Sequence, residues 1–237
     1  MKNRLCKVFL LLCLSLLMML PARAETFTYT GAQDCKLKAL NTLMDCAFAA
    51  EYTFDGTPSN CIARWETPIY VYVQGDYTRQ DKQTLDRFLC DLNLRVPALP
   101  PIYYVSAEAD ANAVISFAPV SKMKEYNSNY VSGNWGFVTF WWNGRHEMYR
   151  MNIVIASDEP NQHQRNSLIL EEFTQGLGIQ DDIDTYTDSI WYRNANSAQE
   201  PTELDWQVLN LLYDPSVSCG MNKDTVYSIL YNKITAK

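Results

Sequence analysis

The segment between residues 136 and 178 constrains the fold of this 237-residue chain most strongly. Two strand-like runs flank Asn143-Gly144, the strongest two-residue turn signal for a β-hairpin. A helix is predicted next, over about 161–175, and the glycines at 176 and 178 end it. A hairpin that leads directly into such a helix predicts a sheet with the helix packed against it.

The rest of the chain mixes helix and strand patterns. Apolar residues recur at helical spacing from Asp34 to about Tyr52, and Thr78 with Asp81 resembles a capping box for a helix to about residue 94. Thr202 caps a C-terminal helix. Further strands are expected at 69–73, 102–105 and 113–117. We therefore predict an α+β domain with a mixed sheet.

The N-terminus has the parts of a cleavable secretory signal peptide. Basic residues precede an apolar run, Val8 to Leu20, which is short for a membrane span and leads to small residues that fit an A-x-A cleavage site. We place the cut after Ala24. The signal peptide is then 1–24, and the mature chain, 25–237, is predicted to be one periplasmic or secreted domain without a membrane span.

Acidic residues dominate the mature chain. The sequence has 20 Lys and Arg against 27 Asp and Glu; four basic residues leave with the signal peptide, and 16 against 27 gives a net charge of −11. Such a surface repels phosphate backbones, so nucleic acid is excluded as an expected partner. A peptide or protein partner is favoured instead.

Cysteines concentrate in the N-terminal part of the mature chain. In an oxidising compartment they favour disulfides over metal binding, because no CxxC pair occurs. Their odd number allows at most two bridges, and the pairing stays open. The disulfide candidates are Cys35, Cys46, Cys61, Cys90 and Cys219.

The end of the helix before the glycine bend carries the candidate site. Glu171 and Gln175 are four residues apart and project from one helix face, and Gly178 lets the chain turn so that Asp181 folds back towards that face. Glu172 lies about 100° around the helix. This is the spacing of the zinc-peptidase motif H-E-x-x-H-x-x-G-x-x-[HD], with Glu172 at the position of the catalytic general base.

Oxygen donors replace both histidines of that motif. Zinc prefers imidazole nitrogen and thiolate, whereas the set Glu171, Gln175 and Asp181 suits Ca²⁺ or Mg²⁺ better. We expect no cofactor, or a divalent cation of that kind before zinc. The acidic residues Asp181, Asp182 and Asp184 lack the glycine and distal glutamate of a calcium loop, so they are interpreted as a solvated acidic loop.

Several motifs, in order along residues 45–222, resemble one family. They are F-A-A-E at 48–51, R-W-x-x-P-I-x-V-x-V-x-G at 64–75, A-N-A-x-I at 111–115, E-E-x-x-Q-x-L-G at 171–178, D-S-I at 188–190, L-D at 204–205, L-Y-D-P at 212–215 and G-M at 220–221. The chain is similar to a proteobacterial family of secreted proteins and lipoproteins of unknown function, with a zincin-like (metallopeptidase-like) core that carries E-E-x-x-Q in place of H-E-x-x-H.

The resemblance implies a fold and no established reaction. A zincin-like core would use the last strand of the hairpin as a substrate-binding edge and would place Met221 in a structural turn beneath the helix.

Among the aromatic residues of the first hairpin strand, Phe140 and Trp142 share one face and Trp141 lies on the other. The pattern does not decide which face is buried.

These observations favour an exported protein that binds a peptide or protein at a degenerate zinc-peptidase-like site without hydrolysing it. Two alternatives stay open. One is a divergent metallohydrolase or peptidase that uses Glu172 as general base. The other is a structural accessory protein of the envelope that has no site.

Overall fold

A computed structural model describes residues 31–48, 60–194 and 197–236. Residues Ala32–Lys237 form one compact unit. The predicted signal peptide, residues 49–51 of the first family motif, and the predicted helix end near Tyr52 lie outside the described residues. Within the described part, no helix combines the length and apolar character needed to cross a membrane.

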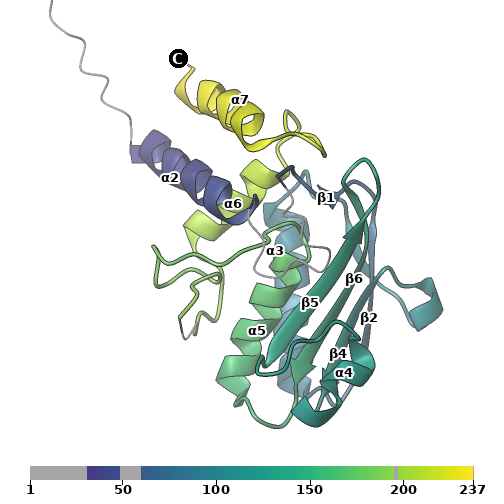
Figure 1. Cartoon of the computed structure of the whole chain (residues 1–237). Coiled ribbons are helices and arrows are strands. Elements are labelled where there is room, and N and C mark those ends of the chain that lie inside the picture. The colour runs from purple at the N-terminus through teal and green to yellow at the C-terminus, as the bar shows by residue number, and fades with distance from the viewer. Residues whose placement is uncertain (1–30, 49–59, 195–196, 237) are drawn as a thin grey trace, which may run out of the picture. The chain divides into compact units, whose positions relative to one another are not determined.

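A mixed sheet of six strands runs through the described part of this unit (Figure 1). Five strands pair in parallel in the order β1-β6-β4-β2-β3, and β5 pairs antiparallel with β6. The mixed sheet predicted from the sequence is therefore confirmed. The strands are β1 (Arg64–Trp65), β2 (Ile69–Gly75), β3 (Ile102–Tyr104), β4 (Ala113–Ala118), β5 (Gly136–Trp142) and β6 (Glu147–Ala156).

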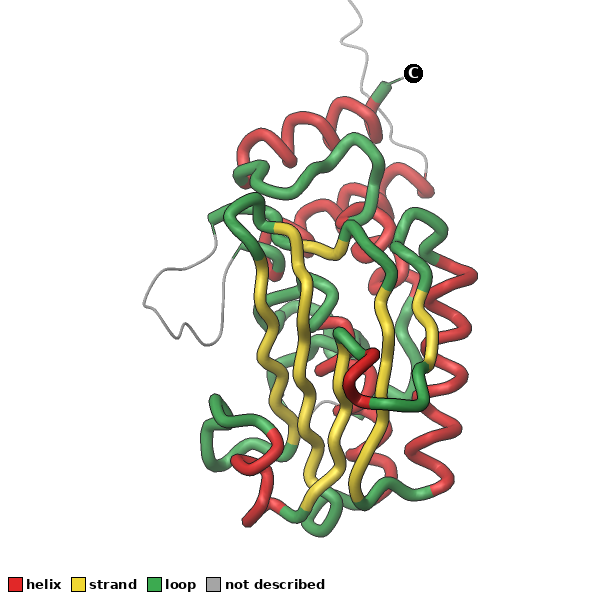
Figure 2. Tube along the Cα trace, turned by 90° about the vertical axis from the view of Figure 1, so that its right-hand side faces the viewer, coloured by secondary structure: helices red, strands yellow, loops and turns green. Residues whose placement is uncertain are grey.

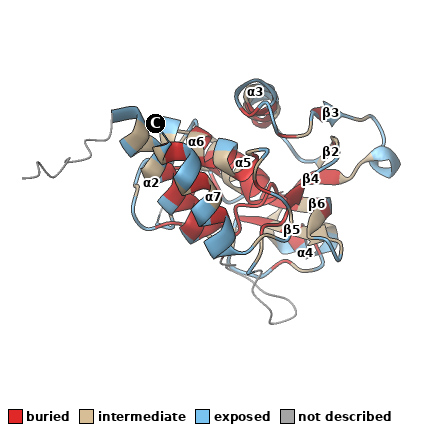
Figure 3. Ribbon diagram, turned by 90° about the horizontal axis from the view of Figure 1, so that it is seen from above, coloured by how far each residue is buried: buried red, intermediate tan, exposed pale blue. Residues whose placement is uncertain are grey.

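The longer helices lie on one side of the sheet (Figure 3). Three of them begin at capping boxes that the side chains form in full, at Thr78, Asn161 and Thr202. The helices are α2 (Gly31–Cys46), α3 (Arg79–Arg95), α4 (Met123–Tyr126), α5 (Gln162–Gln175), α6 (Glu203–Leu212) and α7 (Lys223–Thr235), with short 3₁₀ turns η1 (Glu108–Asp110) and η2 (Val120–Lys122). The predicted helix at about 161–175 is confirmed as α5.

Alternate residues of the central strands face the two sides of the sheet. Ile115 and Ile153 are opposite each other and belong to the main core with Phe173 of α5. On the other face, Val154 joins a smaller core with Met123 of α4. Figure 2 looks onto this second face, and the segment that contains η1 crosses it.

The hairpin differs from its prediction in two ways. Four residues, 143–146, connect the strands instead of two, because the Asn143 side chain accepts hydrogen bonds from the amides of Arg145 and Glu147 and His146 adopts a positive φ of 60°. The expected edge strand is also wrong. The last hairpin strand, β6, is interior, between β4 and β5, since its end is apolar on both faces; the edge strand is β5.

The five cysteines predicted to form disulfides lie in the described residues as free thiols. Cys46 is fully buried at the end of α2, and burial raises the pKa of its thiol. Cys90 is exposed on α3. The predicted disulfides are therefore not supported by the arrangement of these residues.

Candidate functional site

Buried hydrogen bonds fix the end of α5. The indole Nε1 of Trp65 donates to the carbonyl of Gly176 at 2.8 Å, and the Tyr213 hydroxyl donates to the carbonyl of Leu177 at 2.8 Å. Both aromatic side chains are almost completely buried. The helix therefore ends at a defined place, which positions every polar side chain of its last turn.

Gly178 makes the bend that the sequence predicts there. Its φ is +121°, and a Cβ at this position would lie 2.5 Å from the carbonyl oxygen of Ala63. Only glycine satisfies both conditions. After the bend, the amides of Gln180 and Asp181 donate to the carbonyl of Cys46, the last residue of α2, at 2.8 and 3.0 Å.

Glu172 is buried between α5 and the edge strand, with 6% of its surface exposed. A Cβ added to Gly136, the first residue of β5, would lie 2.3 Å from Glu172 Oε1 and 2.9 Å from its Cγ. The carboxylate at the general-base position of the motif thus rests directly on the backbone of β5. Any residue larger than glycine at 136 would displace it.

The predicted ligand positions Gln175 and Asp181 have different partners. Gln175 Nε2 donates to Asp182 Oδ1 at 3.1 Å. Asp181 Oδ1 accepts from Arg193 Nη2 at 3.0 Å and from the amide of Asp182 at 2.9 Å. The Asp181 carboxylate raises the pKa of Arg193 mainly through this hydrogen bond.

The side chains predicted to bind a cation through their oxygen atoms are not arranged for this in the structure. The side chain of Gln175 presents its N–H₂ group to Asp182, and the Asp181 carboxylate is directed at a guanidinium. Within residues 31–48, 60–194 and 197–236, no three His, Cys, Asp or Glu side chains come close enough together to hold a metal ion. We therefore assign no step to a metal.

Sequence reasoning missed Asp182 and Arg193 as members of this site. The acidic loop is not simply solvated, since Asp182 contacts α5 and Arg193 contacts the loop. One signal was present: Arg193 is the only Lys or Arg between Arg165 and Lys223, a stretch with ten Asp and Glu residues. A single cation among so many acids is expected to form ion pairs with them.

The aromatic residues of β5 occupy both faces of the edge strand. Phe140 and Trp142 are half-buried beside the main core, with ring centroids 5.8 Å apart. Trp141 lies on the other face, with the Arg150 guanidinium 5.2 Å from the centre of its ring. The structure thus resolves the register that the sequence left open.

Met221 packs half-buried against the main core. Its carbonyl accepts a hydrogen bond from the amide of Ile62 at 2.9 Å, and the preceding Gly220 has a φ of +81°. Ile62 is next to Ala63, which contacts the Gly178 bend. The methionine turn therefore supports the bend through an intervening segment of the chain.

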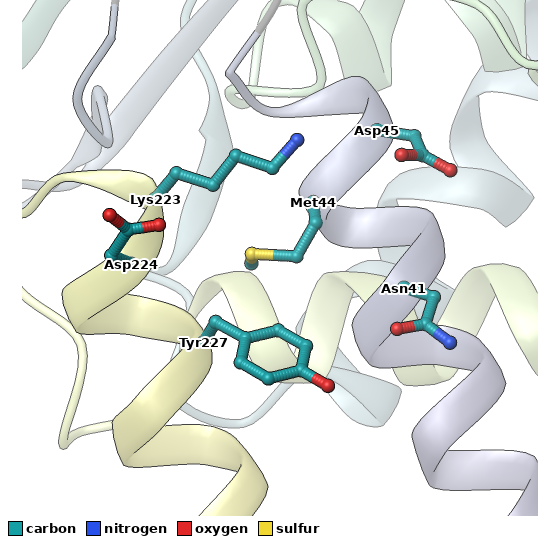
Figure 4. A pocket seen from close by; sticks show the side chains of 6 residues that line it. All are labelled: Asn41, Met44, Asp45, Lys223, Asp224 and Tyr227. Atoms are coloured by element: carbon teal, nitrogen blue, oxygen red, sulfur yellow. The ribbon is translucent and has the colours of Figure 1, made fainter.

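Pockets occur away from these residues. One of about 450 Å³ lies between α2 and α7, and the side chains of Met44 and Tyr227 extend into the space between the helices (Figure 4). Another, of about 220 Å³, is lined by α3, α5 and residues 199–201. Neither is lined by the polar residues of the predicted site.

The fold and site define a mixed-sheet protein in which α5 ends in E-E-x-x-Q shortly before a glycine bend. The chain belongs to the family of proteins of unknown function DUF2927, whose sequence profile matches residues 38–232. No curated protein matches it. Two solved structures of myroilysin are similar: one is 11% identical and covers 65% of this chain and 98% of its own (TM-score 0.41), the other is 9% identical and covers 76% and 96% (TM-score 0.43).

Proposed function

We propose that this protein is exported and binds an extended segment of a peptide or protein along the outer edge of β5, beside α5, without hydrolysing it. The observation that carries the proposal is the composition of that edge. β5 has the sequence G-F-V-T-F-W-W, with no charged residue and no proline. Edge strands that bind nothing are commonly protected by such residues, because they otherwise pair with other chains.

The backbone of β5 offers hydrogen-bonding groups in a defined pattern. The amide of Ala156 donates to the carbonyl of Trp135 at 2.7 Å, which makes these two residues a hydrogen-bonded pair. Antiparallel pairing alternates, so Thr139 bonds to β6 whereas Val138 and Phe140 direct their N–H and C=O groups outwards. In the part of the chain that the structure describes, no other strand pairs with β5.

The side chains of the same residues supply contacts for a bound strand. Val138, Phe140 and Trp142 are half-buried and pack on one face of β5, the face nearer α5. A peptide added as a strand would receive main-chain hydrogen bonds from the edge and apolar contact from this face, as in other complexes formed by β-strand addition.

The donor set at α5 argues against hydrolysis. Glu172 stands at the sequence position of the general base in the peptidase motif, but a base needs a second group that polarises water and the scissile carbonyl. Glu171 and Gln175 stand at the two motif positions that hold zinc in peptidases. The side-chain amide of Gln175 donates a hydrogen bond to Asp182. Binding without cleavage is the function these residues support best.

A proline substitution in β5 tests the proposal. Val138→Pro removes an amide that faces outwards and leaves the ladder to β6 intact, whereas Val138→Thr keeps the amide and changes the side chain by a similar amount. Peptides would be selected from a random decapeptide library on the mature protein, and their dissociation constants measured by fluorescence anisotropy. We expect affinities of the order of micromolar, weakened about ten-fold or more by Val138→Pro but little by Val138→Thr.

Hydrogen exchange of the complex gives an independent reading. Bound peptide should slow exchange of the Val138 and Phe140 amides and leave that of Thr139 unchanged. Equal binding by the two Val138 variants, or protection confined to other elements, would refute edge binding. If the protein cleaves the selected peptides and Glu172→Gln abolishes the cleavage, binding without hydrolysis is refuted.

N-terminal sequencing of protein from the periplasm tests export, with Glu25 expected as the first residue.

A further inference from the structure

The loop after α5 holds one basic side chain against a run of aspartates. Arg193 Nη2 lies 3.0 Å from Asp181 Oδ1 and 2.9 Å from the main-chain oxygen of Asp182. Its Nε lies 3.5 Å from Asp184 Oδ1. The guanidinium thus contacts the carboxylates of Asp181 and Asp184 and the main-chain oxygen of Asp182.

Buried neighbours fix the position of Arg193. Trp191, two residues earlier, is fully buried, and its Nε1 donates to Thr174 Oγ1 of α5 at 2.7 Å. The amide of Ile183 donates to the carbonyl of Trp191 at 2.9 Å, and the amide of Arg193 donates to the carbonyl of Ile183 at 3.0 Å. The backbone that carries the guanidinium is therefore attached both to α5 and to the acidic turn.

A metal ion in a motif of this spacing joins two parts of the chain, the last helical turn and the residues beyond the glycine bend. Hydrogen bonds make the same connection here. Gln175 Nε2 links α5 to Asp182 at 3.1 Å, and Arg193 links Asp182 to Asp181. The Oδ1 atoms of Asp181 and Asp182 are thus directed at N–H donors and not at a cation.

We propose that the guanidinium of Arg193 takes the structural role that a metal ion has in peptidases with this spacing: it neutralises the acidic turn and fixes it to the end of α5. The inference is independent of peptide binding to β5. It follows that the stability of the protein does not depend on divalent cations while Arg193 is present. Removal of the guanidinium leaves the carboxylates of Asp181 and Asp184 without their cationic partner, so that calcium in solution can partly screen their charge.

Thermal unfolding with calcium as the only added ligand tests this. Mature wild-type protein, Arg193→Gln, Arg193→Lys and the control Arg95→Gln would be compared in EDTA and in Ca²⁺ well above about 1 mM, the weakest range for protein sites. Arg95 forms an exposed ion pair with Glu203 at 2.8 Å, so its loss removes an ion pair that does not involve the acidic turn.

We expect wild type and Arg193→Lys to unfold at the same temperature in both buffers. Arg193→Gln should unfold roughly 2–5 °C lower in EDTA and recover part of this loss in Ca²⁺, whereas Arg95→Gln should not respond to Ca²⁺. Stoichiometric metal in wild-type protein purified without chelators would overturn the proposal. So would a calcium response of wild type or of Arg95→Gln as large as that of Arg193→Gln. If Arg193→Gln does not fold, a calcium response of Arg193→Lys overturns the proposal and its lack supports it.

Discussion

Replacing Asp81 with asparagine would test how firmly α5 is attached to the rest of the molecule. The Asp81 carboxylate is completely buried at the start of α3. It accepts hydrogen bonds from Arg165 Nε of α5 at 3.0 Å and from the amide and hydroxyl of Thr78, both at 2.8 Å. The substitution keeps the shape of the side chain but removes the charge that compensates the buried guanidinium.

The expected loss follows from these contacts. Breaking a buried ion pair by removing one partner costs about 3–5 kcal/mol. Arg165 retains hydrogen bonds to the carbonyls of Pro160 and Ser157, at 3.1 and 3.3 Å, which favours the lower end of that range. About 3 kcal/mol corresponds to a fall in Tm of roughly 6–12 °C for a domain of this size.

Urea denaturation of the mature protein, followed by circular dichroism, would measure the change in midpoint at constant m-value. Asp86→Asn is the matched control, because Asp86 lies on the same helix in an exposed ion pair with Lys82 and should cost less than about 1 kcal/mol. The double variant Asp81→Asn with Arg165→Met should be less destabilised than the sum of the single variants. A loss for Asp81→Asn no larger than that of Asp86→Asn, or strict additivity in the double variant, would refute this account of the α3–α5 contact.

Three further predictions concern the bend and its surroundings. Gly178→Ala should lower the free energy of unfolding by about 3 kcal/mol, measured in urea, because alanine disfavours a φ of +121° and its Cβ would lie 2.5 Å from a carbonyl oxygen. Gln175→Glu should lower the Tm at pH 7 by placing a second carboxylate next to Asp182, with recovery in acid when one of the two is protonated. Lys233→Met should destabilise the protein only above acidic pH. Burial tends to raise the pKa of Asp214, but hydrogen bonds from Lys233 and Ser216 lower it overall. The stabilisation therefore exists above the unfolded value of about 3.9 and is lost as pH falls through the lower folded value. Curves of Tm against pH for wild type and this variant should therefore separate at pH 6 and converge in strong acid.

Local signals in the sequence were the most informative about the fold. The boxes at Thr78 and Thr202 located two helix starts correctly, since a capping side chain and its partner are only three residues apart. The last helix, α7, was not predicted. Its signal was present in Asn222 as N-cap and in buried residues at helical spacing, Val226 and Leu230, but it is weaker than the others.

Pairing between strands that are far apart in the sequence could not be predicted from it. Which hairpin strand forms the edge depends on β4 pairing with β6, and nothing within the hairpin specifies that contact. The candidate site shows the same division. Glycine at 178 and the shared helix face of Glu171 and Gln175 follow from spacing, whereas the ion pair of Arg193 crosses an irregular loop whose course no periodicity describes.

The bend after α5 is held by parts of the chain that are far away in sequence. Gln180 bonds to the carbonyl of Ala47 across 133 residues, and the Trp65 indole reaches Gly176 across 111. Contacts of this range close large loops and form late during folding, after hairpins and single helices. α5 and the hairpin can therefore assemble while the geometry of the motif is still undefined. That geometry is established only when the first helix of the domain meets the residues beyond Gly178, so a chain truncated at its beginning would lose the bend even though every residue of the motif is present.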